Sequence, residues 1–177
     1  MRLWVLVAGL VLPMMAWSAS DEAPALDHKA CAIGVWNMFD VIDNWMLNVP
    51  LEKSVAMSGN EEAALEIYNL ADRNGVAEAY AGAFASHYDC ESQVQPMGDT
   101  VTDEMAAYRR CSLQNVLRTK VLFALRESVP LEKTLSEYDE SLHGVIKALY
   151  GTQQTYNIEK TFAASARAFQ DCIKAID

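Results

Sequence analysis

Apolar side chains recur at every third or fourth position in two long stretches of the chain. In the first stretch, between residues 31 and 49, they form a stripe made of Val35, Met38, Ile42, Trp45 and Val49. The second stretch begins at Cys111 and carries a similar stripe of Leu113, Val116, Leu117, Val121 and Leu125. This spacing places the apolar residues along one face of a helix, so both stretches are predicted to be amphipathic helices.

The remainder of the first half also has the pattern of helices. Turn residues at 58–60 and 73–75 separate a helix predicted over about 61–72 from another predicted over 76–90. The alternation of apolar and polar residues that marks a half-buried strand does not occur there.

The second half follows the same scheme. A helix is predicted through residues 141–150, followed by a break near Gly151 and a last helix from about Tyr156. Because no strand pattern occurs here either, the predicted fold class is all-α.

The two halves share a sequence repeat. The pentapeptide "VPLEK" occurs at residues 49–53 and again at 129–133. When Cys31 is aligned with Cys111, the match runs without a gap to the end of this pentapeptide, and seven of the 23 positions are identical. A second ungapped block pairs Tyr68 with Tyr150 and Cys90 with Cys172. Two matching blocks in the same order predict two tandem helical modules that arose by duplication.

The prolines of the repeat, Pro50 and Pro130, predict a corner between two helices. A residue that precedes proline is disfavoured in the helical conformation, so each first helix is expected to stop about two residues before its proline. Proline itself is favoured at the first position of the next helix, where its missing N–H costs nothing. The glutamate two positions later falls in the first turn, where the helix dipole favours a negative charge. These prolines are therefore interpreted as structural corners.

Four cysteines follow the first twenty residues, and an even number in an exported chain indicates two disulfides. Four cysteines allow three pairings. Because a module copied whole carries its own bridge, the predicted pairs are Cys31 with Cys90 and Cys111 with Cys172. Each bridge closes a loop of about sixty residues, which stabilises the fold by about 4 kcal/mol in the chain-entropy description.

The predicted organisation has four parts. Residues 1–20 combine an arginine, a short apolar run and small residues, which is the layout of a cleaved signal peptide. Helical module 1 is predicted over 21–92, a polar linker over 93–104 and helical module 2 over 105–177. The protein is therefore expected in the periplasm or secreted, without membrane insertion after the signal is cleaved.

The charge balance limits the possible partners. Without the signal segment, which holds one arginine and no acidic residue, 13 basic side chains remain against 24 acidic ones, a net charge of about −11. Such a surface repels phosphate backbones, so no binding of nucleic acid is expected. A basic protein surface is a plausible partner for the same reason.

The sequence offers few candidates for chemistry. His28, His87 and His143 are single residues without a counterpart in the other half, and they are interpreted as ordinary helix residues. His87 aligns with a phenylalanine, which indicates a partly buried packing position. The acidic pair Asp40 and Asp43 is interpreted as solvated. Because no catalytic or metal-binding motif is present, we expect no enzyme, no cofactor and no metal site.

Aromatic residues crowd the first predicted helix and are candidates for binding a partner. Trp36 and Phe39 do not share the face of the Val35 to Val49 stripe, so part of this surface either faces outward or meets the second module. Exposed aromatic patches often mark protein contacts. Trp36, Phe39 and Trp45 are therefore candidate partner-binding residues, with an inter-module core as the alternative.

These observations favour an exported, non-enzymatic module that binds another protein, as an inhibitor or immunity protein or as an envelope accessory. A second hypothesis is an acid-stress or holdase-like chaperone, because protonation of many carboxylates removes the negative charge as pH falls. A third is a small all-α secreted enzyme of chorismate-mutase type, which rests on size, helicity and export alone.

Overall fold

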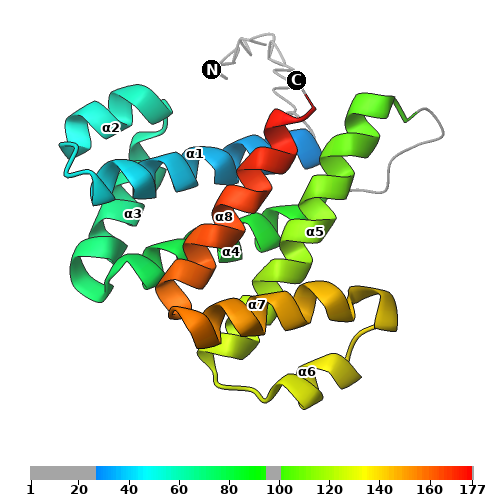
Figure 1. Ribbon diagram of the computed structural model, residues 1–177. Coiled ribbons are helices and arrows are strands. Elements are labelled where there is room, and N and C mark those ends of the chain that lie inside the picture. Colours follow the sequence, from blue (N-terminus) through cyan, green and yellow to red (C-terminus); the bar gives the residue numbers. More distant parts are fainter. Residues whose placement is uncertain (1–26, 95–100, 177) are drawn as a thin grey trace, which may run out of the picture.

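The computed structural model describes residues 27–94 and 101–176, and all regular structure in these ranges is helical. The centre of the molecule consists of four long helices: α1 (His28–Met46), α4 (Val76–Gln93), α5 (Asp103–Arg126) and α8 (Ile158–Lys174). α1 packs along α4 and α5, and α8 packs along α5 and α4 (Figure 1). The prediction of an all-α fold is confirmed for the described residues, none of which forms a strand.

Shorter helices connect the long ones in each half. α2 (Leu51–Ser58) and α3 (Glu61–Asn74) lead from α1 to α4, at the left of Figure 1. In the second half, α6 (Leu131–Ser136), the 3-10 turn η1 (Glu140–Leu142) and α7 (His143–Thr155) lead from α5 to α8, at the bottom of the same view.

The predicted signal peptide, residues 1–20, lies outside the described residues. Within the described ranges, no helix combines the length and the apolar character needed to cross a membrane. Of the predicted linker, residue 93 is the last of α4 and residues 103 and 104 begin α5, so both long helices reach into it.

Each half is closed by its own disulfide, as predicted. Cys31, near the start of α1, is bonded to Cys90 near the end of α4, with 5.7 Å between the Cα atoms. Cys111 of α5 is bonded to Cys172 near the end of α8, with 5.8 Å between the Cα atoms. The bridges therefore fasten the first long helix of each half to the last.

The two proline corners share an unusual backbone conformation. Asn48 and Ser128, eighty positions apart, have φ of 56° and 59°, the left-handed region that non-glycine residues rarely adopt. The helices end at Met46 and Arg126, slightly earlier than predicted. Pro50 and its counterpart Pro130 are N-cap residues rather than the first residues of α2 and α6, a shift of one position from the prediction.

A tyrosine hydroxyl fixes each corner, from α3 in the first half and from α7 in the second. The Tyr68 hydroxyl donates a hydrogen bond of 2.7 Å to the backbone oxygen of Val49. The Tyr150 hydroxyl donates a bond of the same length to the backbone oxygen of Val129. The bonds satisfy the carbonyl just before each proline, where the chain has left one helix and not yet entered the next.

One hydrophobic core extends across both halves. The ring of Phe39 in α1 lies 5.0 Å from Phe84 in α4 and 6.3 Å from Phe169 in α8, measured between centroids. Phe84 in turn lies 5.8 Å from Phe162 in α8. A smaller cluster around Val121, Leu125, Ile146 and Tyr150 fills the space between α5 and α7.

The predicted stripe on α5 is partly wrong. Leu113 is 51 % exposed, whereas the buried positions at the start of the helix include Ser112, Asn115 and Thr119. Their burial matches that of Ala32, Val35 and Phe39, which lie eighty positions earlier along α1. Hydrogen bonds accommodate the polar groups: Ser112 and Asn115 contact His87, and Thr119 donates to the backbone oxygen of Asn115. The later part of the stripe is correct, because Val121 and Leu125 are buried.

The predicted break near Gly151 is also wrong, since α7 continues through this residue to Thr155. A single glycine inside a helix costs about 1 kcal/mol, which is too little to stop it. The helix ends where Asn157 caps α8, accepting a hydrogen bond of 2.8 Å from the backbone N–H of Lys160.

Candidate functional site

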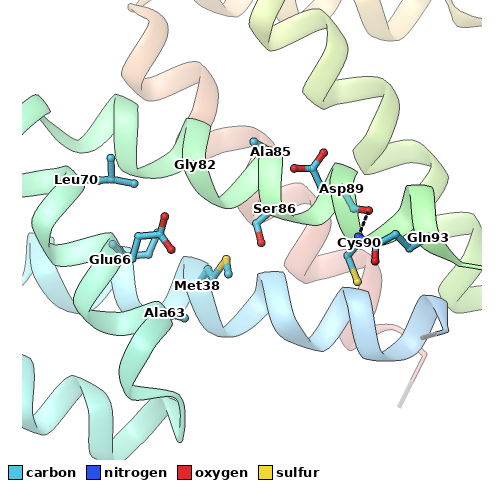
Figure 2. Close-up of a pocket in the computed structure, with 11 residues that line it drawn as sticks. Met38, Ala63, Glu66, Leu70, Gly82, Ala85, Ser86, Asp89, Cys90 and Gln93 are labelled. Atoms are coloured by element: carbon cyan, nitrogen blue, oxygen red, sulfur yellow. Dashed lines mark hydrogen bonds between the residues drawn. The ribbon is translucent and has the colours of Figure 1, made fainter. Parts of the chain in front are cut away.

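A groove of about 510 Å³ runs between α1, α3 and α4. Figure 2 shows Met38 from α1, Glu66 from α3 and Ser86 from α4 pointing into the space between the three helices. We call this the α3–α4 groove, and it is lined by Met38, Ala63, Glu66, Ile67, Leu70, Gly82, Ala85, Ser86, Asp89, Cys90 and Gln93.

The floor of the groove is apolar. Ile67 is 3 % exposed and belongs to the core, while Met38 and Leu70 pack against the core and stay half-buried. The α4 side of the floor is made of small residues, Gly82 and Ala85. A Cβ atom at Gly82 would come within 2.9 Å of Leu70 Cδ1, so the glycine allows α3 and α4 to approach closely.

The rim of the groove is acidic and polar. Glu66, Ser86, Asp89 and Gln93 are all exposed. Gln93 is held along α4 because its side-chain amide donates a hydrogen bond of 3.1 Å to the backbone oxygen of Asp89. Among the described residues that line the groove, two are carboxylates and none is basic.

A second, shallower hollow of about 460 Å³ adjoins the groove on the outer face of α3. It shares Glu66 and Leu70 with the groove and adds Glu62 and Leu65, which is 47 % exposed. Arg73, at the end of α3, contributes a positive charge there. Beyond the groove, the surface thus combines apolar residues with charges of both signs.

The three predicted partner-binding residues do not line the α3–α4 groove. Trp36 and Trp45 are half-buried, and their indole N–H groups donate to Asp40 Oδ2 at 2.7 Å and to Asp72 Oδ1 at 2.8 Å. Phe39 is 1 % exposed and therefore belongs to the core. Its assignment as a contact residue is corrected, because its ring packs against α4 and α8. Phe39 therefore belongs to a core shared by the two halves, which was the alternative prediction.

The acidic pair near Trp36 is more constrained than the sequence suggested. Asp40 also accepts a hydrogen bond of 2.9 Å from the Gln170 amide of α8, and the Tyr80 hydroxyl donates to Asp43 at 3.2 Å. Burial raises the pKa of the Asp40 carboxyl, and the hydrogen bond from Trp36 opposes this rise.

A buried polar cluster lies between α1, α4 and α5, and we call it the His87 cluster. Its members are His28, His87, Glu91, Ser112 and Asn115. His87 is 2 % exposed, while Ser112 and Asn115 are fully buried. Burial, and to a smaller extent the charge of His28, lowers the pKa of His87 to about 4.

The contacts in the cluster indicate which ring nitrogen of His87 carries the hydrogen. His87 Nδ1 lies 3.1 Å from the amide nitrogen of Asn115 and accepts a hydrogen bond from it. His87 Nε2 lies 3.5 Å from both Ser112 Oγ and Glu91 Oε1, so a hydrogen on Nε2 faces these two oxygens. Glu91 Oε2 also contacts His28 Nδ1 at 2.7 Å. One buried carboxylate therefore connects two histidines.

The chemistry of the His87 cluster is limited by its enclosure. A serine, a histidine and an asparagine lie in sequence along a hydrogen-bonded path, as in nucleophilic catalysis. Ser112 has no contact with solvent, however, and its hydroxyl is 3.5 Å from the imidazole. A substrate would have to enter between α4 and α5 to reach it. Within the described ranges, no group of three histidine, cysteine, aspartate or glutamate side chains is arranged so that it could hold a metal ion.

Sequence reasoning missed both sites, although each left a signal. His87 and Glu91 are four residues apart, which places them together on one face of α4. Gly82, Ala85 and Ser86 form a run of small residues on another face of the same helix. His143, interpreted as an ordinary helix residue, lies near the backbone oxygens of Leu135 and Tyr138, at 3.0 and 3.1 Å.

Comparison with known proteins gives no assignment: no protein-family model matches the chain, and no curated protein or solved structure matches it significantly.

Proposed function

We propose that the chain is an exported module that acts by binding another protein, as an inhibitor or immunity protein or as an envelope accessory. The observation that carries this proposal is the α3–α4 groove, which combines an apolar floor with an acidic rim. Burial of apolar surface supplies affinity in protein contacts, and complementary charge supplies specificity and a faster association. The two disulfides agree with export, because such bonds persist in oxidising compartments.

We also propose that the two halves arose by duplication of one helical module. Supporting this idea, Asn48 and Ser128 share the left-handed conformation, and the aligned tyrosines Tyr68 and Tyr150 make the same hydrogen bond to the valine that precedes each corner proline. Burial along residues 31–42 and 111–122 follows the same order of buried and open positions. The groove, in contrast, is built from residues of the first half alone. On this view, one copy became specialised for binding while the other supports the shared core.

The test of protein binding is affinity capture with the disulfide-intact mature protein from the envelope fraction of the producing cells. We expect a partner that is retained at low salt, released as ionic strength rises, and displaced by an excess of untagged protein. Capture of no partner, together with turnover in a screen of small substrates, would reject the proposal in favour of an enzyme.

A second candidate function, an acid-responsive chaperone, is favoured by the His87 cluster. Its imidazole resists protonation until the pH reaches about 4, and a charge placed there would be buried between the two halves. At the aligned position, Phe169 packs against Phe39 with an apolar contact, so a titratable group is not required for this packing. The test is suppression of aggregation of an unfolding client at pH 3 and pH 7. Activity at pH 3 alone supports this function, and no activity at either pH rejects it.

A further inference from the structure

Resting on the proposed function, we infer that the α3–α4 groove binds an amphipathic helix of the partner, one that carries lysine or arginine on the flanks of an apolar stripe. Three features of the groove lead to this occupant: the kind of surface that the fold offers, the length of the groove, and the distribution of charge on it.

The described part of the chain has no strand, so it offers no sheet edge to which a partner strand could be added. In the alternative mode, an amphipathic helix lays its apolar face into a groove between helices. The α3–α4 groove has the required floor, because Met38, Ile67 and Leu70 present apolar side chains from two helices. The small residues Gly82 and Ala85 form the α4 side of the floor, where Leu70 lies against Gly82.

The length of the groove fits about three helical turns. Its lining residues on α4 run from Gly82 to Gln93, at intervals of three or four that keep them on one face. Eleven residues of rise correspond to about 16 Å along the helix axis. A partner helix of similar length would lie alongside α4 and place two or three apolar residues against the floor.

The charges of the rim select a basic helix. Glu66 on α3 and Asp89 on α4 provide carboxylates from the two helices that border the groove, and the adjoining hollow adds Glu62 together with the basic Arg73. The formal charge of the whole chain is −10, so a cationic segment is also attracted from a distance. An acidic helix of equal hydrophobicity would be repelled.

The test uses a fluorescein-labelled synthetic peptide of 14 residues with leucines on one face and lysines on the other. Its comparison peptides are a leucine and glutamate version, and a lysine and glycine version that has the charge without the apolar face. Fluorescence anisotropy with the mature, disulfide-intact protein should show saturable binding of the leucine and lysine peptide only. Failure of this peptide to bind at low salt, or equal binding of the three, would overturn the inference.

Variants of the protein locate the binding site. Ser86→Arg places a bulky cation inside the groove, and we expect it to lower the affinity for the leucine and lysine peptide at least tenfold. Ser92→Arg adds the same charge to the same helix outside the groove, and should change the affinity less than twofold. Equal losses in both variants would show that only the overall charge matters, which would overturn the inference. Circular dichroism and thermal unfolding establish that both variants keep the fold.

A second pair of variants tests the rim. Asp89→Asn should lower the affinity for the peptide about three- to tenfold. The affinity of this variant should also change less as the salt concentration rises. Asp171→Asn removes the aligned carboxylate in α8, which does not line the groove, and should do neither. The opposite ranking of the two variants would place the peptide elsewhere.

The capture experiment separates this inference from the proposed function. If Ser86→Arg captures the same envelope partner as the unmodified protein, the module binds proteins through another surface, and only the groove assignment fails. If the peptide binds in the groove but no envelope partner is captured, the proposed function fails while the chemistry of the groove stands.

Discussion

His87 Nε2 lies 3.5 Å from Glu91 Oε1, one turn further along α4, and neither side chain is more than 5 % exposed. Glu91 Oε1 is buried and has no hydrogen-bond partner among the described residues, and the imidazole lies within ion-pair distance of it. The pair lies against Ser112 and Asn115 of α5, and thus at the contact between the two halves. A titratable group in such a place links pH to the stability of that contact.

The sign of this link follows from the direction of the pKa shift. The folded protein holds the pKa of His87 at about 4, below its ordinary value of 6.5, so between these values the unfolded chain binds more protons. The free energy of unfolding should therefore fall as the pH is lowered from about 6.5 to about 4. Below about pH 4, His87 adds no further change. The contribution is about 3 kcal/mol over the whole interval.

Substitution separates this contribution from that of the carboxylates. His87→Gln keeps polar atoms beside Asn115 but does not titrate, so its stability should fall less steeply between pH 6.5 and 4. His143→Gln, at the start of α7 and outside the cluster, should keep the steep fall of the unmodified protein. Urea unfolding at several pH values measures both. Identical pH profiles for the unmodified protein and His87→Gln would contradict the assignment.

The tyrosine bonds at the corners make a second prediction. Tyr68→Phe removes one hydrogen bond, to Val49, and should lower the free energy of unfolding by about 1 kcal/mol. Tyr150→Phe should cost more, about 2 kcal/mol, because this hydroxyl is buried and also contacts Thr134 Oγ1 at 2.7 Å. Tyr156→Phe, at a side chain that is 63 % exposed, is the control and should have no effect. Denaturant unfolding gives the ranking.

The corners also show how far the sequence could be read. The prolines correctly located the turn between helices, because the restriction on the preceding residue is local. The left-handed conformation of Ser128 was not predictable, since serine has no preference for it and the shape of the turn is imposed by the packing around it. Local chemistry located the corner, but only the tertiary structure determined its backbone.

The same distinction applies to the sites. The disulfide pairing followed from the repeat, which the cysteines themselves delimit. The groove did not follow, because Glu66 and Asp89 are 23 positions apart and are brought together only by the packing of α3 on α4. The burial of Ser112 and Asn115 was hidden because hydrophobic patterns assign polar residues to the surface.

The strained corner residues can be tested by glycine substitution. Ser128→Gly should stabilise the protein by about 0.5–1 kcal/mol, because glycine adopts a φ of 59° without steric conflict. Asn48→Gly should gain less, since asparagine tolerates this conformation better than serine does. Thermal unfolding compares the two variants, and a loss of stability for Ser128→Gly would contradict the assigned conformation.

The disulfides should contribute nearly equally. They join residues 59 and 61 positions apart, and the entropy of loop closure changes only slowly with loop length. Replacing either pair by serine, Cys31→Ser with Cys90→Ser or Cys111→Ser with Cys172→Ser, should lower the free energy of unfolding by about 4 kcal/mol. Guanidinium unfolding measures each loss. Losses that differ by more than about 2 kcal/mol would show that local packing, rather than loop closure, dominates.

The contact between Gly82 and Leu70 gives a prediction that joins stability to binding. Gly82→Ala should gain up to about 1 kcal/mol from helix propensity and lose a similar amount, because the new methyl group would meet Leu70 Cδ1 at 2.9 Å. Gly34→Ala in α1 is the matched control: nothing lies within 4 Å of its new Cβ, so it should keep the full gain. Thermal unfolding should rank Gly34→Ala above Gly82→Ala.

Binding should distinguish the same two variants. In Gly82→Ala the end of the Leu70 side chain is forced away from α4 and into the α3–α4 groove, so the floor becomes shallower. The leucine and lysine peptide should therefore bind about three- to tenfold more weakly to this variant and unchanged to Gly34→Ala, as measured by anisotropy. If Gly82→Ala gains as much stability as Gly34→Ala and binds the peptide normally, then Leu70 does not rest against α4, and the groove is not shaped by this glycine.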